Sequence, residues 1–256
     1  MPELRSVTAT RYVTPLREGG SLPGLVEADD DGLYVLKFRG AGQGVKALVA
    51  EIVAGELARA LGLAVPEIVL IEVDPALGAA EPDPEIQDLI TGSAGVNVGL
   101  DFLPGSLPYT PAAGLQPAPD AAAEIVWLDA LVTNVDRTPR NPNLLVWHDR
   151  LWLIDHGAAL YFHHRDWSPE ADAARPFPAI ADHVLLPLAS PLPEVDARLA
   201  ERLSVDALHD ALSLVPAGWA DGEAYVDYLA RRLAAPRAFA AEAEQARLGL
   251  QRGAAA

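Results

Sequence analysis

A Pro- and Ala-rich segment divides the sequence into two halves with different patterns. Residues 106–119 contain four prolines, and proline ends helices and is excluded from the interior of sheets. Before this segment the apolar residues form short β-branched runs, and after it they recur at helical spacing. We therefore expect a two-lobed α+β fold, with residues 1–103 as the first lobe, 104–119 as a connection and 120–252 as a mainly helical lobe.

The first half has the pattern of an antiparallel sheet with one main helix. Within residues 8–38, apolar stretches alternate with turns rich in glycine and aspartate, which predicts two hairpin strands and a third strand ending near Lys37. Residues 46–63 are rich in helix formers and close at a glycine, which predicts a helix. Residues 68–73 and 96–103 are again apolar and predict further strands.

The second half begins with a helical pattern and continues into a polar loop and a short hairpin. We expect Asp120 to cap a helix that carries the residues up to the loop. Residues 136–143 are rich in Asp, Asn and Pro, which predicts a loop. Residues 144–149 and 151–155 predict the two strands of a hairpin, and amphipathic patterns beyond them predict helices.

The composition excludes several classes of chemistry. The chain has no cysteine, so disulfides, thiolate nucleophiles and cysteine-bound zinc are excluded. Adjacent His163 and His164 lack a third ligand at zinc spacing, and we interpret them as part of a loop. The formal net charge of −17 opposes direct binding to nucleic acid and to anionic membranes. The sequence shows neither a signal-peptide pattern nor a membrane-spanning apolar run, and we expect a cytoplasmic protein.

Polar residues at two places in the first half fit the requirements of phosphoryl transfer from ATP. This reaction needs a cation on the phosphates, a carboxylate that orients the attacking hydroxyl, and oxygen ligands for magnesium. Lys37 ends an apolar strand whose alternation directs its side chain away from Leu36 and toward a cleft. Glu51, on the helix that follows, is placed to pair with Lys37.

The polar loop and the hairpin of the second half supply the remaining groups. Asp136 and Asn141 lie five residues apart, in a loop that Pro139 and Pro142 keep from being helical. The Asn141 amide oxygen and the Asp155 carboxylate suit magnesium, which leaves Asp136 to accept or orient the proton of a hydroxyl. Each residue alone is more often an ordinary turn or surface residue, so the hypothesis depends on their conjunction in this order.

In this order of residues the chain resembles the HipA-like kinases and, more distantly, the phosphatidylinositol 3-/4-kinases. The resemblance spans roughly residues 15–160 and is carried by a strand lysine, a helix glutamate, a loop motif and a turn: Lys37, Glu51, N-x-D-R-x-x-x-N at 134–141 and D-x-G at 155–157. It implies a two-lobed protein-kinase-like fold in which Asp136 is catalytic while Asn141 and Asp155 bind metal.

The resemblance also implies that ATP and Mg²⁺ bind between the lobes. Backbone groups at the connection between the lobes, residues 98–103, would face adenine: Asp101, Phe102 and Leu103. A glycine-rich hairpin would cover the phosphates: Gly19, Gly20 and Ser21.

The implied activity is that of an ATP- and magnesium-dependent phosphotransferase with an alcohol group as acceptor, and within that class a protein Ser/Thr kinase. Two alternatives stay open, namely a kinase of small molecules or lipid head groups and a nucleotide-binding module without turnover. The intact set of Lys37, Asp136, Asn141 and Asp155 argues against the second alternative. The acceptor is left open between a protein and a small molecule.

Overall fold

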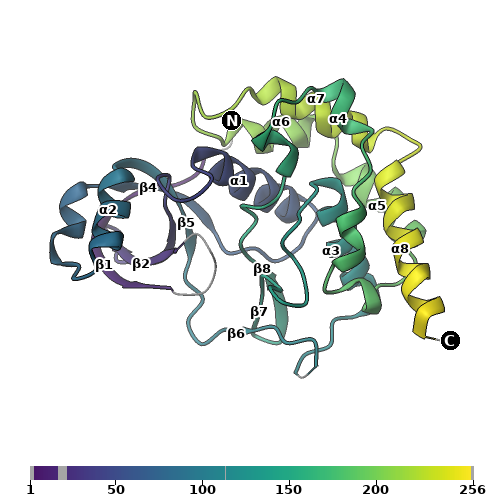
Figure 1. Cartoon of the computed structure of the whole chain (residues 1–256), viewed down its shortest axis with the longest axis horizontal. Helices are drawn as coiled ribbons and strands as arrows, with labels where there is room; N and C mark the ends of the chain where they lie inside the picture. The colour runs from purple at the N-terminus through teal and green to yellow at the C-terminus, as the bar shows by residue number, and fades with distance from the viewer. Residues whose placement is uncertain (1–2, 17–21, 113, 255–256) are drawn as a thin grey trace.

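Two lobes of different secondary structure lie side by side in the computed structural model, which describes residues 3–16, 22–112 and 114–254 (Figure 1). The first lobe is a barrel of strands with helix α1 beside it, and the second lobe is mainly helical. The expected α+β fold is confirmed.

Five strands close the first lobe into a barrel in the order β1-β2-β3-β5-β4. Their bounds are β1 Ser6–Pro15, β2 Gly24–Ala28, β3 Leu33–Lys37, β4 Ile68–Val73 and β5 Gly95–Asp101. Four of the pairings are antiparallel, as the hairpin pattern predicts, whereas β1 and β4 pair in parallel. Buried apolar side chains such as Val26, Leu36 and Ile71 fill the interior.

Helix α1, Val45–Ala60, lies between the barrel and the second lobe (Figure 1). Its buried residues extend around the helix and share one continuous core with strands of the first lobe and helices of the second. The helix ends where Gly62 takes a φ of 84° and the Leu63 N–H donates to the Ala58 carbonyl, as in a Schellman motif. Because α1 packs on both lobes, it fixes Glu51 at their junction.

Two helical elements between β4 and β5 lie in a stretch to which the sequence analysis assigned no structure. They are the 3₁₀ helix η1, Pro75–Ala80, and helix α2, Pro84–Gly92. The side chains of Asp74 and Asp83 accept hydrogen bonds from backbone N–H groups two residues on, and a proline takes the first helical position in each. The repeated Asp-Pro pair was therefore the sequence signal for both elements.

The connection between the lobes contributes a short strand to a second sheet. Strand β6, Leu107–Pro108, pairs with β7, Leu144–Trp147, which forms the expected hairpin with β8, Arg150–Leu153. Helix α3, Pro119–Leu131, follows the connection, but the predicted capping residue, Asp120, is not its N-cap. Ala118 is the N-cap residue, and Asp120 lies in the first turn, where its charge is favourable to the helix dipole.

Helix α3 forms the buried centre of the second lobe, with Trp127 fully enclosed. The segments that follow are η2 Tyr161–His164, α4 Pro169–Ala173, η3 Pro178–Asp182, η4 Leu186–Leu188, α5 Leu192–Arg202, α6 Val205–Ser213, α7 Gly222–Leu233 and α8 Ala238–Ala254. Of these segments, α5, α7, α8, η3 and η4 contact α3, whereas α4 packs on α7 and α6 on α1 and α7; the last helix, α8, lies beside α3 and α5 (Figure 1). Within the described ranges, no helix combines the length and apolar character that a membrane span requires.

Candidate active site

Three predicted residues from different elements form one buried ionic cluster at the junction of the lobes. Lys37 ends β3, Glu51 lies on α1 and Asp155 follows β8. The Lys37 Nζ lies 2.6 Å from Asp155 Oδ1 and 4.0 Å from Glu51 Oε2. Lys37 and Glu51 are buried, whereas 29% of the Asp155 side chain is exposed, so a ligand in the cleft can reach Asp155 first.

Strand alternation explains why Lys37 faces this cluster. Leu36 fills the barrel interior, so the next side chain must leave the opposite face of β3. Lys37 lies opposite Val98 on β5, and the side of the sheet that it faces is covered by α1 and the second lobe. Lys37 therefore points away from the barrel interior, toward α1.

The charges of the cluster stabilise one another against burial. Burial alone would lower the pKa of Lys37, but Glu51 and Asp155 raise it above its usual value. Burial alone would raise the pKa of Glu51, but Lys37 and His156 hold it at about 2. The shifts favour a cationic Lys37 and an anionic Glu51 at neutral pH, and a cation is what phosphate oxygens attract.

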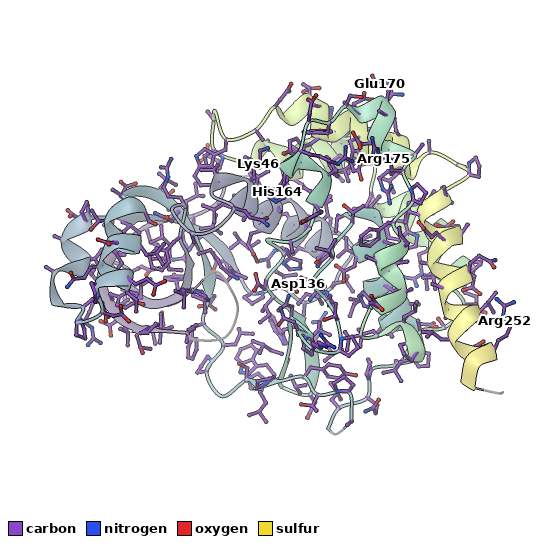
Figure 2. All side chains as sticks on the ribbon, viewed as in Figure 1. Lys46, Asp136, His164, Glu170, Arg175 and Arg252 are labelled. Atoms are coloured by element: carbon purple, nitrogen blue, oxygen red, sulfur yellow. The ribbon has the colours of Figure 1, made fainter. Side chains whose placement is uncertain are left out.

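The loop after α3 holds Asp136 and Asn141 in direct contact. Asn141 Nδ2 donates to Asp136 Oδ2 at 2.8 Å, and Asn143 Nδ2 approaches the same oxygen at 3.3 Å. The backbone of Thr138 and Asn141 is joined by two hydrogen bonds, which makes the loop a tight turn. Figure 2 places Asp136 centrally, between the two lobes. The other carboxylate oxygen, Oδ1, accepts no hydrogen bond from the described residues.

A buried network that the sequence analysis did not identify supports this loop. Asp129 Oδ2 accepts hydrogen bonds from Arg137 Nε at 2.5 Å and from His183 Nε2 at 2.9 Å, and Asp129 Oδ1 accepts from Asn134 Nδ2 at 3.0 Å. Burial would raise the pKa of Asp129, but Arg137 and His183 hold it well below its usual range. All four side chains are almost completely enclosed.

The network connects the segments that carry the predicted catalytic and metal-binding groups. Asn134 Oδ1 accepts from the Asp136 N–H at 3.1 Å. Arg137 Nη1 donates to the Asn143 carbonyl and, at 3.4 Å, to that of Ile154, the residue before Asp155. One guanidinium therefore fixes the spacing between the loop and Asp155. The arginine of the loop motif was the available sequence signal, but nothing in the sequence indicates its distant partners.

Of the other predicted site residues, the structure describes those assigned to adenine but not those assigned to the phosphates. Strand β5 continues to Asp101, so the connection between the lobes starts later than residue 98. The N–H groups of Asp101 and Phe102 are bonded to the carbonyls of Glu67 and Leu33, which leaves the Leu103 N–H without a hydrogen bond within the described chain. The predicted phosphate-covering residues lie outside the described residues: Gly19, Gly20 and Ser21.

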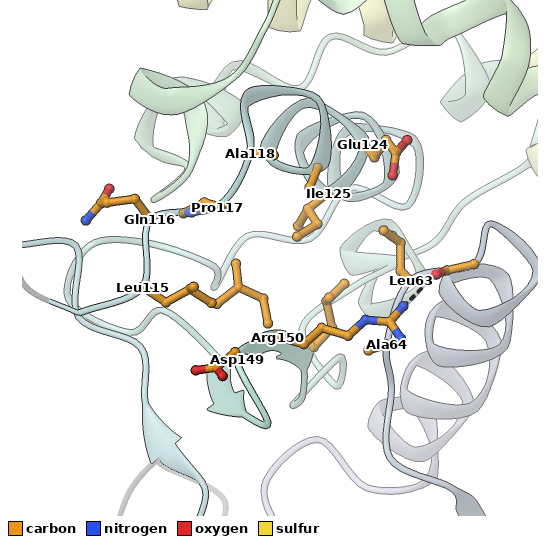
Figure 3. Close-up of a pocket in the computed structure, with 14 residues that line it drawn as sticks. Leu63, Ala64, Leu115, Gln116, Pro117, Ala118, Glu124, Ile125, Asp149 and Arg150 are labelled. Carbon is orange, nitrogen blue, oxygen red and sulfur yellow. Dashed lines mark hydrogen bonds between the residues drawn. The ribbon is translucent and has the colours of Figure 1, made fainter.

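A separate pocket lies away from this cluster (Figure 3). It encloses about 260 Å³ between the loop after α1, the connection before α3 and the β7–β8 turn. Leu63, Leu115 and Ile125 give it apolar walls, and Arg150 closes one side by donating to the Gly62 carbonyl at 3.1 Å. None of the predicted site residues lines it, so it is not the candidate active site.

The donor set at the cleft fits a magnesium ion that retains other ligands. No three His, Asp or Glu side chains of the described residues gather into a metal site. Magnesium requires no such protein cage, since it is commonly held by one or two protein oxygens together with phosphates and water. The partly exposed Asp155 carboxylate and the Asn141 amide would be donors of that kind.

Comparisons with known proteins agree with this fold. The sequence model of the HipA-like kinases matches residues 10–227. Solved structures with a similar fold include the Helicobacter pylori proinflammatory kinase CtkA, at 13% identity and a TM-score of 0.58, with 98% of this chain and 99% of that chain covered. The Golgi casein kinase matches at 14% identity and a TM-score of 0.53, and its complex with Mn/ADP at 16% and 0.53; each covers 96% of this chain and 74% of the other. A comparison with curated sequences gives no match.

Proposed function

The chain belongs to the HipA-like kinase family, and on that basis we propose that it is an ATP- and magnesium-dependent phosphotransferase whose acceptor is a Ser or Thr hydroxyl of a protein. The observation that carries the proposal is the ionic cluster of Lys37, Glu51 and Asp155, in which the charge of Asp136 also acts on Lys37. A cation and carboxylates from both lobes are thus gathered at one site, which is the set that phosphoryl transfer needs.

Lys37 and Glu51 bind and orient the nucleotide phosphates in this proposal. Lys37 is enclosed, so its ammonium is poorly hydrated and interacts strongly with phosphate oxygens. Asp155 holds Lys37 at 2.6 Å in the nucleotide-free protein, and Glu51 is the second carboxylate that can retain it when Asp155 has other partners.

Asn141 and Asp155 would hold the magnesium ion, which when bound supplies positive charge on the phosphate oxygens. The support for a nucleotide with a divalent cation comes from the donor set of the cleft and from the Mn/ADP complex of the similar Golgi casein kinase. The Leu103 N–H, free of partners in the described chain, is the donor we assign to the adenine ring.

Asp136 acts on the acceptor hydroxyl. The hydroxyl oxygen attacks the γ-phosphorus, the bond between that phosphorus and the β,γ-bridging oxygen breaks, and the hydroxyl proton passes to Asp136. The amides of Asn141 and Asn143 fix Oδ2 and leave Oδ1 for this proton. Asp136 is thus held in one orientation before any substrate binds, which favours catalysis.

Calorimetry with ATP, with and without magnesium, tests the proposal on the native protein and on two variants. We expect magnesium-dependent binding to the native protein and a loss of at least about ten-fold in affinity in Asp155→Ala, because a cation ligand and the Lys37 partner are removed together. In Asp136→Asn binding is expected to persist, while phosphoryl transfer falls by about 10²–10⁴-fold.

The acceptor is tested by phosphate transfer from γ-labelled ATP to a Ser/Thr peptide library and, in parallel, to small alcohols and inositol lipids. Transfer to peptides that disappears in Asp136→Asn supports the protein kinase. Transfer confined to small alcohols or lipids would replace the protein acceptor. Folded native protein that binds no nucleotide would exclude the kinase proposal altogether.

A further inference from the structure

The turn formed by Asp155, His156 and Gly157 packs closely on one face of α1. This face consists of Ala47, Glu51 and Gly55, which are spaced by four residues and so lie one above the other. A Cβ on Gly157 would stand 3.6 Å from Ala47 Cβ and 3.7 Å from Glu51 Oε2. A Cβ on Gly55 would stand 3.8 Å from His156 Nδ1, so the imidazole lies in van der Waals reach of this face.

This packing brings the imidazole of His156 to the carboxylate of Glu51. His156 Nδ1 lies 3.4 Å from Glu51 Oε1, on the side of the carboxylate remote from the 4.0 Å contact between Oε2 and Lys37 Nζ. His156 is fully buried and Glu51 is 1% exposed. The two carboxylate oxygens therefore face different partners.

Three buried polar side-chain atoms of this pair have no hydrogen-bond partner among the described residues. Both ring nitrogens of His156 and Oε1 of Glu51 lack any hydrogen bond, although all three atoms are buried. A buried polar atom without a partner is costly, and a buried carboxylate oxygen most of all. A small approach of Nδ1 and Oε1 would satisfy one atom of each residue at once.

We propose that His156 is a positioning residue for the phosphate-binding lysine: its Nδ1–H donates to Glu51 Oε1 and so holds Glu51 Oε2 toward Lys37. The inference rests on the proposed function, because Lys37 is taken to bind the nucleotide. His156 itself touches neither nucleotide nor acceptor and acts through Glu51. We call His156, Glu51 and Lys37 the relay, because His156 acts on Lys37 through Glu51.

The relay matters most when Asp155 is occupied by other partners. Lys37 makes its short contact with Asp155, at 2.6 Å, and only a long one with Glu51. Once Asp155 is drawn to other ligands, Glu51 is the remaining anion that can hold Lys37, so the rotamer of Glu51 decides where the ammonium stands. An apolar side chain at position 156 would fill the same space without fixing that rotamer.

Three substitutions of His156 separate this role from packing. The amide of Asn can place a donor where Nδ1 stands, the amide of Gln reaches the position of Nε2, and Phe fills the space with no donor. We expect His156→Phe and His156→Gln to lower kcat/KM for ATP on the order of ten-fold, and His156→Asn to stay within about three-fold of the native enzyme. Equal losses in the Asn and Phe variants would overturn the proposal.

A double-mutant cycle with Glu51→Ala identifies the residue through which His156 acts. When Glu51 is absent, His156→Phe should cost less than about two-fold, because the partner that it positions is gone. An undiminished ten-fold loss in that background contradicts the relay. His209→Asn, at an exposed position of α6, is the matched control and should leave the kinetics unchanged. Thermal unfolding of each variant shows whether it is folded.

A second readout needs no turnover. Ring ¹⁵N chemical shifts of the nucleotide-free protein should show a proton on His156 Nδ1 in the native chain and a loss of that preference in Glu51→Ala. A native His156 whose Nδ1 bears no proton would overturn the inference even if the enzyme is active. If the native protein fails to bind nucleotide, the proposed function fails, whereas the shifts still decide whether His156 holds Glu51.

Discussion

Individual residues of the candidate site differ in how far the sequence could predict them. The identities and spacing of Lys37, Asp136 and Asp155 are local properties of a strand end, a loop and a turn, and the sequence locates them. The partnership of Asp129 with His183 joins positions 54 residues apart, and neither residue belongs to a local pattern. Only the folded chain reveals it, since contacts of this kind are set by packing.

The buried carboxylate of Asp129 is expected to be important for stability. Removing one partner of a buried ion pair leaves an uncompensated charge and costs ~3–5 kcal/mol. Asp129→Asn, which leaves Arg137 unpaired, should therefore lower the free energy of unfolding in urea by about that amount.

An exposed ion pair of similar chemistry provides the control for this substitution. Asp227 pairs with Arg231 on the surface of α7. Exposed pairs contribute little, so Asp227→Asn should cost at most ~1 kcal/mol. Equal effects of the two substitutions would show that the Asp129 network does not stabilise the fold.

His163 should make the protein less stable in acid. Burial, with smaller contributions from His164 and Lys46, lowers the pKa of His163 from 6.5 to about 3. Between these two pH values His163 is protonated in the unfolded chain and neutral in the folded chain. The free energy of unfolding therefore rises with pH in this window, by up to ~1.4 kcal/mol per pH unit for one proton.

Urea unfolding between pH 4 and pH 6 checks the contribution of this histidine. In His163→Asn the slope of the free energy of unfolding against pH should decrease by up to ~1.4 kcal/mol per pH unit, the contribution of one proton. The asparagine leaves Tyr225 Oη a polar neighbour. The exposed His209→Asn should leave the slope as it is. An unchanged slope in His163→Asn would assign the acid sensitivity to other groups.

At the scale of elements, the sequence identified strands and the main helices but missed α2. Helix-forming residues with a closing glycine were the evidence for α1, and a helical pattern after a polar cap was the evidence for α3; both exist near their predicted bounds. The short α2 has only two buried residues, Ile86 and Ile90, too few to establish a period, so its Asp-Pro cap was the better signal. The parallel pairing of β1 with β4 had no local signal at all.

The turn between β3 and α1 should tolerate no side chain where it touches the end of α2. A Cβ on Gly40 would lie 2.8 Å from the Gly92 carbonyl oxygen, a backbone atom that cannot move aside easily. Gly40→Ala is therefore expected to lower the free energy of unfolding by ~1–3 kcal/mol, the cost of overpacking.

Gly92 itself provides the matched control for this turn. No atom lies within 4 Å of a Cβ built on Gly92, at the end of α2. Gly92→Ala should be neutral or stabilising by up to ~1 kcal/mol, since alanine favours the helix. Equal unfolding midpoints for the two variants would contradict the close packing at Gly40.

At the scale of the whole molecule, the shared core predicts that the lobes unfold together. Residues of α1 pack with barrel residues such as Ile68 and Val98 and with the centre of the second lobe, α3. All five tryptophans lie between positions 127 and 219, so their fluorescence reports the second lobe, whereas far-UV circular dichroism reports both. We expect coincident urea transitions by the two signals. A fluorescence midpoint separated from the dichroism midpoint would show that the lobes are independent.

The parallel contact that closes the barrel also has a consequence for synthesis of the chain. One edge of β1 is covered by β2 soon after both emerge from the ribosome, but the other edge waits for β4, where Ser6 pairs with Leu70. An uncovered strand edge is a template for association with other chains. This edge of β1 thus stays exposed to chaperones and to aggregation until residues 70–72 have been synthesised.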